Sequence, residues 1–259
     1  MKSFVYNDER HEYLLDGKKM TGVTTVLGSV GGAGGLIQWA ANEAVKVASA
    51  KINSGKAYTE DELAAIFAEA KNAHRKKKED AGDLGTESHL VCELFEQGKD
   101  YSHLSEEAQL RAKPYIDWYK KEVAESLFVE RPLFSRAWFV GGTPDGGFRT
   151  KEGKNLINDK KFKNKIYDSK AYWQMAAYQE MIEEMSNDTE TTVRLEWKDG
   201  TIEEYKNPQE YLGSLGKVEW DGCVVLLMDG KEGVQPLYRF AYGQDLPSFL
   251  AALTIYKTL

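Results

Sequence analysis

The chain has 259 residues, with 34 lysines and arginines against 41 aspartates and glutamates, and a net charge of −7. This length is enough for one large domain or two small ones, and no apolar run is long enough to span a membrane. The acidic balance argues against a protein that coats nucleic acid by bulk charge, although basic residues cluster locally at 74–78 and 160–165.

The N-terminal half is predicted to be helical after an initial β-hairpin. Alternation around Asp8-Glu9-Arg10 predicts a β-hairpin over 3–15. The N-terminus leads into these alternating residues and not into the apolar stretch of a signal peptide. Thr21 to Val26 is predicted to be an extended segment. Thr59 and Glu62 form a capping box at a helix start. Helices are expected at 36–50, 59–78, 86–97 and 105–125. A loop is expected at glycines 31, 32, 34 and 35, and Gly82 and Gly85 are expected to interrupt the helical stretch. A break or kink is expected at Pro114.

The predicted secondary structure changes from mainly helical to mainly β-strand near Leu127. Lys198-Asp199-Gly200 predicts a hairpin turn between strands at 193–197 and 201–205. The other expected elements are strands at 127–134, 136–141, 145–150, 154–162, 220–228 and 235–242, and helices at 169–186 and 246–257. The order predicts one α/β domain over 1–259, with helices packed on a central mixed sheet and an N-terminal helical elaboration. Its parts are the hairpin and helices of 1–84, a core over 85–185, and the strands and helix of 186–259.

The two cysteines, Cys92 and Cys223, are too few and too far apart to form a metal-binding pair motif. Both are expected to be free thiols, which fits a reducing, cytoplasmic setting. Two cysteines also cannot supply the four thiolates of an iron–sulfur cluster.

The chemistry of the chain is expected at Asp145, Asp159 and Lys161. Side chains alternate along a strand, so Asp159 and Lys161 point the same way, while Asp145 lies one hairpin earlier and can reach the same side. Carboxylates suit Mg²⁺ or Mn²⁺, and a neighbouring lysine can offset charge in a transition state. Acid-x-Lys alone carries little weight, because it also occurs at Asp16, Glu69, Glu152, Asp168, Glu196, Glu204 and Asp229. The alternative is a polar surface hairpin.

Four motifs in order resemble the PD-(D/E)XK nuclease superfamily, in particular its RecB-like exonuclease branch, which includes phage and CRISPR-associated proteins. Over about 85–180, the motifs similar to that branch are Gly85-Thr86-Glu87-Ser88-His89, Gly142-Thr143-Pro144-Asp145, Asp159-Lys160-Lys161 and Gln174-Met175-Ala176-Ala177-Tyr178. The resemblance implies a restriction-endonuclease-like core and a metal-dependent DNA exonuclease.

The resemblance also implies roles for particular residues. It makes His89, Asp145 and Asp159 metal ligands together with the backbone carbonyl of Lys160, and Lys161 catalytic. Gln174 and Tyr178, which share a helix face, would help to place the DNA strand. For this pair the alternative is ordinary helix packing, and for His89 it is a hydrogen-bonded histidine at a helix start. Glu130 is left out, since its strand offers no independent reason to include it.

The sequence departs from the branch's pattern at two positions. Lys160 stands where an apolar residue is usual, and Phe162 where threonine or serine is usual. Both departures leave the expected ligands intact.

Two other functions compete with a DNA exonuclease of phage or bacterial recombination, repair or degradation. One is a catalytically inactive module that binds DNA or a partner, and the other is a structure-specific endonuclease. No Gly-x-x-x-x-Gly-Lys-Ser/Thr loop is present, so coupling to unwinding would need a helicase or recombination partner.

Overall fold

The computed structural model describes residues 2–30, 34–163, 165–166, 169–228, 233–240 and 243–259. They form two compact units, one of Met1–Val30 with His89–Leu259 and the other of Gly31–Ser88. The second unit contains helix α2 (Gly34–Lys51) and most of helix α3 (Glu60–Glu96), whose last turns belong to the first unit. The chain is therefore a mixed α/β protein with helices concentrated in its N-terminal half.

The first unit contains one mixed sheet that carries the candidate site. Its strand order is β13-β12-β9-β8-β5, in which β9 pairs parallel with β12 and the other neighbours are antiparallel. The strands are β5 (Val123–Val129), β8 (Gly146–Thr150), β9 (Asn155–Lys161), β12 (Gly222–Met228) and β13 (Val234–Arg239). All seven residues of β12 are buried, as expected of a central strand covered on both faces.

A second five-stranded sheet has the order β11-β10-β1-β2-β3 and joins the N-terminal strands to the hairpin over 192–205. Its central strand β1 pairs parallel with β10 and antiparallel with β2. The strands are β1 (Ser3–Asn7), β2 (Glu12–Leu15), β3 (Lys18–Lys19), β10 (Thr192–Glu196) and β11 (Ile202–Tyr205). A small third sheet, β4-β7-β6, consists of β4 (Thr21–Gly22), β6 (Leu133–Ser135) and β7 (Val140–Gly142).

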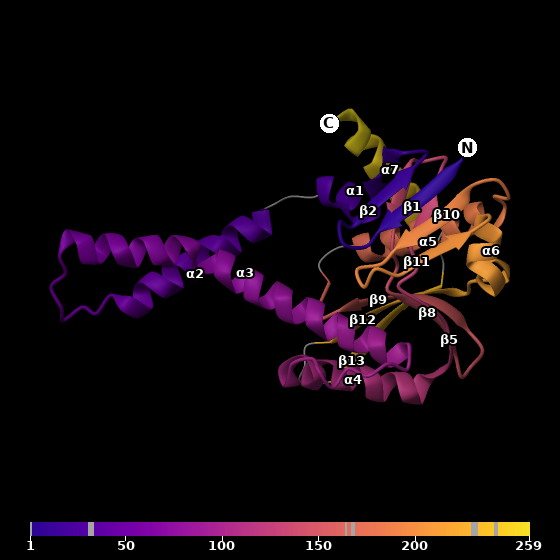
Figure 1. Ribbon diagram of the computed structural model, residues 1–259. Coiled ribbons are helices and arrows are strands. Elements are labelled where there is room, and N and C mark those ends of the chain that lie inside the picture. Colours follow the sequence, from indigo (N-terminus) through magenta and orange to yellow (C-terminus); the bar gives the residue numbers. More distant parts are fainter. Residues whose placement is uncertain (1, 31–33, 164, 167–168, 229–232, 241–242) are drawn as a thin grey trace. The chain divides into compact units, whose positions relative to one another are not determined.

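Helices cover the site-bearing sheet on both faces (Figure 1). Helix α4 (Glu106–Glu122) packs against β5, β12 and β13, and helix α5 (Lys170–Ser186) packs against β9 and β12. Helix α5 also contacts the three remaining helices of the unit, α1 (Val23–Ser29), α6 (Pro208–Leu212) and α7 (Asp245–Thr258), together with the 3₁₀ turn η1 (Gly213–Lys217). Helix α5 is therefore the central packing element, and its inner face contributes Met175, Met181 and Met185 to the core.

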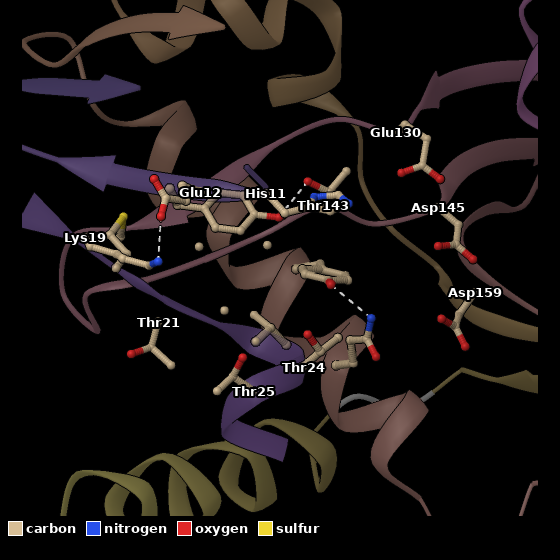
Figure 2. Close-up of a pocket in the computed structure, with 18 of the residues that line it drawn as sticks. His11, Glu12, Lys19, Thr21, Thr24, Thr25, Glu130, Thr143, Asp145 and Asp159 are labelled. Carbon is tan, nitrogen blue, oxygen red and sulfur yellow. Dashed lines mark hydrogen bonds and ion pairs between the residues drawn. The ribbon is translucent and has the colours of Figure 1, made fainter. Parts of the chain in front are cut away.

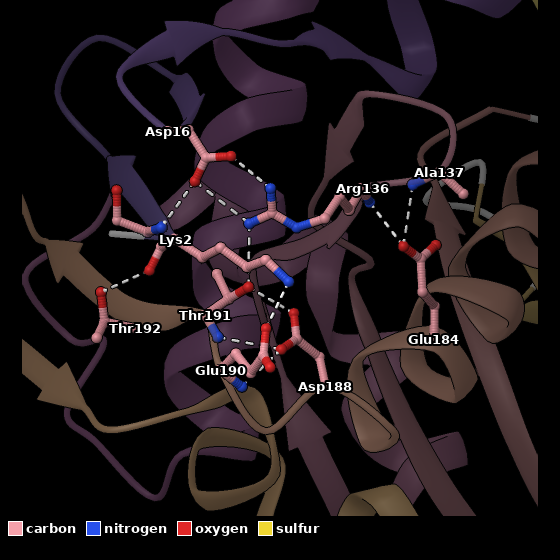
Figure 3. Close-up of polar contacts among 10 residues, drawn as sticks. Lys2, Asp16, Arg136, Ala137, Glu184, Asp188, Glu190, Thr191 and Thr192 are labelled. Carbon is pink, nitrogen blue, oxygen red and sulfur yellow. Dashed lines mark hydrogen bonds and ion pairs between the residues drawn. The ribbon is translucent and has the colours of Figure 1, made fainter.

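Polar contacts around Arg136 connect three segments that lie far apart in the sequence (Figure 3). The Arg136 guanidinium forms an ion pair with Asp16 and donates to Thr191 Oγ1 at 3.0 Å. The Glu184 carboxylate of α5 accepts hydrogen bonds from the backbone N–H groups of Arg136 and Ala137. These bonds attach the N-terminal hairpin to α5 and to the segment before β10.

The structure confirms most of the elements that were predicted from local patterns. The hairpins β1–β2 and β10–β11 pair antiparallel as expected. Thr59 and Glu62 form the capping box, with the Glu62 N–H donating to Thr59 Oγ1 at 3.2 Å and the Thr59 N–H to Glu62 Oε2 at 2.8 Å. Helices α2, α5 and α7 fall close to their predicted ranges, and the Cys92 and Cys223 thiols are buried.

Four predictions of secondary structure were wrong. The extended segment at 21–26 is a strand only at Thr21–Gly22, because Val23, Val26 and Leu27 have helical spacing and bury one face of α1. Gly82 and Gly85 do not interrupt the chain, since α3 runs through both; a helical glycine costs only about 1 kcal/mol. Of the break or kink expected at Pro114, the break is absent, because helix α4 continues through this residue. The strand expected at 136–141 is replaced by β6 and β7.

Some sequence features fall outside the described residues. The glycine loop does so at 31–33, while Gly34 and Gly35 begin α2. The basic run 74–78 lies in α3, but apart from Arg75 its side chains lie outside the described part. Among the helices of the described ranges, none is both long and apolar enough to cross a bilayer.

Candidate functional site

Five of the seven predicted site residues line one pocket of about 860 Å³ in the first unit (Figure 2). Its lining includes Asp145, Asp159, Lys161, Gln174 and Tyr178. The carboxylates come from the start of β8 and from β9, and the amide and phenol come from α5. The remainder of the wall carries hydroxyl groups and small residues, among them Tyr13, Thr21, Thr24, Thr25, Gly141, Gly142 and Thr143.

Asp145 is held by the neighbouring strand. The backbone N–H of Lys160 donates to Asp145 Oδ2 at 2.6 Å, and His89 Nδ1 lies 3.8 Å from the same oxygen. Burial by itself would raise the pKa of Asp145, but His89 in its protonated form and the ammonium groups of Lys161 and Lys160 bring that pKa below its usual value. Asp145 is therefore an ionised carboxylate at neutral pH.

Asp159 and Lys161 face the pocket from the same side of β9, as their spacing predicts. Lys161 Nζ donates to Asp159 Oδ1 at 2.6 Å. Asp159 Oδ2 is buried and has no hydrogen-bond partner among the described residues. Burial raises the pKa of Asp159 to about 6, against the lowering effect of Lys161 and with a further rise from Asp145. Burial disfavours the Lys161 ammonium, but Asp159 and Asp145 raise its pKa, so it stays protonated.

His89 approaches the carboxylates from α3, outside the residues that line the pocket. Burial lowers the pKa of His89, so its imidazole is neutral at physiological pH. The His89 ring meets the Phe162 ring edge to face, with centroids 5.1 Å apart. Arg111 donates to the Phe162 carbonyl at 2.8 Å and its guanidinium lies over the Phe162 ring. The phenylalanine that departs from the expected motif thus supports the histidine.

The Lys160 side chain points to the face of β9 opposite Asp159 and Lys161. There its ammonium lies 2.5 Å from the Glu96 carboxylate, and both side chains are only 1% exposed. Burial disfavours the Lys160 ammonium, but Glu96 and Asp145 raise its pKa above the usual value. The second departure from the motif is therefore a buried ion pair and not a group in the pocket.

Glu130 is a site residue that the sequence reasoning missed. It lines the same pocket, and Figure 2 shows its carboxylate at the end where Asp145 and Asp159 lie. Val129 pairs with Gly146 across β5 and β8, which puts Glu130 opposite Asp145. Its φ of 41° is a strained backbone conformation of the kind that is common at functional sites. Burial and the charge of Asp145 raise the Glu130 pKa well above its usual value. Only the pairing of two predicted strands could have revealed it.

Gln174 and Tyr178 form a hydrogen-bonded pair on α5, one turn apart. Gln174 Nε2 donates to the Tyr178 hydroxyl at 2.9 Å. A Cβ atom at Gly142 would lie only 2.5 Å from Tyr178 Cε1 and 3.1 Å from Val23 Cγ2. Gly142 is therefore required for the Tyr178 ring to reach the pocket.

We expect Gly142→Ala to destabilise the protein by about 1–3 kcal/mol, because a buried aromatic ring must shift to admit the methyl group. Gly28→Ala is the matched control, since Gly28 is an exposed position of helix α1 and a Cβ atom there meets nothing within 4 Å. That variant should be neutral or stabilising by up to about 1 kcal/mol. Urea unfolding of both variants measures the difference, and equal midpoints would contradict the prediction.

No protein-family model matches this sequence, and no curated protein matches it. The functional assignment therefore depends on the residues and geometry of the pocket.

Proposed function

We propose that the protein is a metal-dependent DNA exonuclease of the PD-(D/E)XK type. The observation that carries the proposal is that Asp145, Asp159 and Lys161 line one pocket from two adjacent strands, with Asp159 Oδ2 buried and unpartnered among the described residues. A buried carboxylate oxygen without a donor is costly unless a ligand satisfies it. The match between three spaced sequence motifs and one pocket supports this function over a polar surface hairpin.

The order of elements around the site supports a restriction-endonuclease-like core. Helix α4 leads into the antiparallel strands β5, β8 and β9, and α5 lies in the connection that returns the chain to β12, parallel to β9. The acidic residues stand where this core would expose them, at the start of β8 and the end of β9. The core arrangement is part of the proposal.

The donor set fits Mg²⁺ or Mn²⁺. Asp145, Asp159 and the Lys160 carbonyl offer oxygen atoms, and His89 offers a neutral imidazole nitrogen, which Mn²⁺ accepts readily. Among the described residues, no three His, Cys, Asp or Glu side chains are already gathered to hold a metal ion. Lys161 occupies Asp159 Oδ1, so the oxygen of Asp159 that is left for a metal ion is Oδ2, which has no partner among the described residues. Such a metal polarises a phosphoryl oxygen and supplies hydroxide near neutral pH.

The residues of this chain then have separate roles. Asp145 and Asp159 supply negative charge, and the Asp145 carboxylate is oriented by the Lys160 N–H. Lys161 is protonated, so it acts as a donor and a positive charge beside the scissile phosphate and not as a base. Gln174 and Tyr178 supply polar donors on the α5 wall, where they contact the DNA strand.

We expect Mn²⁺ affinity to fall as pH is lowered through about 6, because a proton competes with the metal for Asp159, whose pKa is about 6. Competition by one proton weakens the apparent affinity by about tenfold per pH unit below that value. Burial lowers the pKa of His89, so its imidazole becomes protonated only at a lower pH than that of a free histidine. Calorimetry with Mn²⁺ from about pH 5 to pH 7.5 measures the dependence, and constant affinity over this range would contradict it.

The proposal is tested with end-labelled linear DNA and covalently closed circles, single- and double-stranded, with Mg²⁺ or Mn²⁺ and with excess EDTA. We expect linear DNA to be degraded, closed circles to survive, and EDTA to abolish cleavage. Rapid nicking of closed circles would indicate an endonuclease of the same fold. DNA binding without any cleavage would indicate an inactive binding module, and undiminished cleavage in EDTA would exclude a metal-dependent site.

A further inference from the structure

A buried ion pair lies behind the candidate site and takes no part in the pocket. Lys160 Nζ and Glu96 Oε1 are 2.5 Å apart. The Tyr115 hydroxyl donates to the same Glu96 oxygen at 2.8 Å, and Lys160 Nζ lies 5.4 Å from the centre of the Tyr115 ring. The pair is therefore fully desolvated and held by a third group.

The ion pair connects the elements that carry the proposed metal ligands. Lys160 donates twice to Asp145, from its backbone N–H to Oδ2 at 2.6 Å and from Nζ to the main-chain oxygen at 3.3 Å. Glu96 lies seven residues after His89 on α3, about two turns along the same helix face. Glu96 thus links the helix of His89 to Asp145 and to the strand of Asp159.

We propose that Glu96 is a positioning residue, which acts through Lys160 to hold Asp145 and the Lys160 carbonyl in the geometry that binds metal. This inference rests on the proposed function. A buried ion pair is a poor source of stability, because apolar side chains of similar size stabilise a core equally well or better. What apolar side chains cannot supply is a directed donor to the Asp145 main chain. Groups that orient metal ligands in this way affect metal affinity strongly.

The residue after Asp145 supports this role. A Cβ atom at Gly146 would lie 3.3 Å from Glu96 Oε2 and 3.0 Å from Asn158 Nδ2. The absence of a side chain leaves room for the Glu96 carboxylate directly behind Asp145. Asn158 is also buried there, and neither polar atom of its amide has a partner among the described residues. The space behind the site is thus polar and closely fitted around Glu96.

The test is calorimetric titration of the full chain with Mn²⁺, together with urea unfolding, for the parent, Glu96→Gln and the double variant Glu96→Leu/Lys160→Met. We expect Glu96→Gln to weaken Mn²⁺ binding by about 10–100-fold. The double variant should regain stability, because no charge stays buried alone, but its affinity for Mn²⁺ should stay low. Asp245→Asn is the control, since it breaks an ion pair of a buried carboxylate with Arg239 that does not line the pocket. It should lose stability and keep its affinity.

The outcomes separate this inference from the proposed function. A folded parent that binds no Mn²⁺ would overturn the proposed metal site itself. A parent that binds Mn²⁺ while Glu96→Gln binds it equally well would overturn the positioning role. Recovery of both stability and affinity in the double variant would also overturn it, because apolar packing would then suffice.

Discussion

Lys161→Ala should reduce the turnover of DNA cleavage by about 10²–10³-fold, or roughly 3–4 kcal/mol of transition-state stabilisation. The Lys161 ammonium is protonated, lies in the pocket and contacts Asp159 Oδ1 at 2.6 Å. Its removal takes away a positive charge near the reacting phosphate but leaves the carboxylates in place. Mn²⁺ affinity should therefore be unchanged or higher, since a positive charge beside the Asp159 carboxylate is removed. Turnover at saturating metal and calorimetry measure the two effects separately.

Lys198→Ala is the matched control for this prediction, because Lys198 is also the lysine of an acid-x-Lys sequence. Its partner in that sequence, Glu196, is already engaged by Arg194 at 2.9 Å and by Asn7 at 3.0 Å. Turnover of the control should stay near that of the parent. If Lys161→Ala cuts like the parent while Lys198→Ala does not, the site must be reassigned to the strand of Glu196.

Lys160→Ala should destabilise the folded state by about 3–5 kcal/mol, because it leaves the Glu96 carboxylate buried without its cation. From the sequence, only the backbone carbonyl of Lys160 is expected to matter for cleavage, so the loss of turnover should be milder than for Lys161→Ala. The side chain does face away from Asp159, as predicted, but it faces a buried acid and not solvent. Urea unfolding measures the loss of stability, provided that the slope of the unfolding free energy against urea concentration is the same for both proteins.

Lys154→Ala is the corresponding control, because Lys154 directly precedes β9, the strand that contains Lys160. Lys154 pairs with Asp221 at 2.9 Å, but its side chain is 52% exposed, so the loss should be at most about 1 kcal/mol. Equal losses for the two lysine variants would mean that Glu96 tolerates isolation at little cost, and the buried pair would then have no special energetic role.

Local patterns predicted the fold where the chain pairs with its own near neighbours. The hairpin at Asn7 to Glu12 and the helix from Lys170 follow from alternation and from helical spacing, and both are confirmed. The prediction failed where glycines inside a long helix were taken for helix ends. Gly82 and Gly85 are weak helix formers, yet α3 continues through them.

The part of the candidate site that lies within the sequence motifs was predictable. Asp145, Asp159 and Lys161 do line one pocket, and His89 lies beside Asp145. Glu130 and Glu96 were not predicted because their relation to the site comes from strand pairing and from packing behind the sheet. Neither contact leaves a periodic signal in the sequence, so only the three-dimensional arrangement of β5, β8 and α3 reveals them.

The parallel pairing of β1 with β10 has a consequence for the time course of synthesis. Ser3 lies opposite Thr192, so 189 residues separate strands that become neighbours. At about 5–20 residues per second, roughly 10–40 s pass between the emergence of the two strands from a ribosome. During that interval the side chains of Phe4 and Tyr6, both buried in the native protein, have no β10 or β11 beside their strand. The nascent chain therefore presents an aggregation-prone edge until β10 arrives, and chaperone binding is expected at its first seven residues.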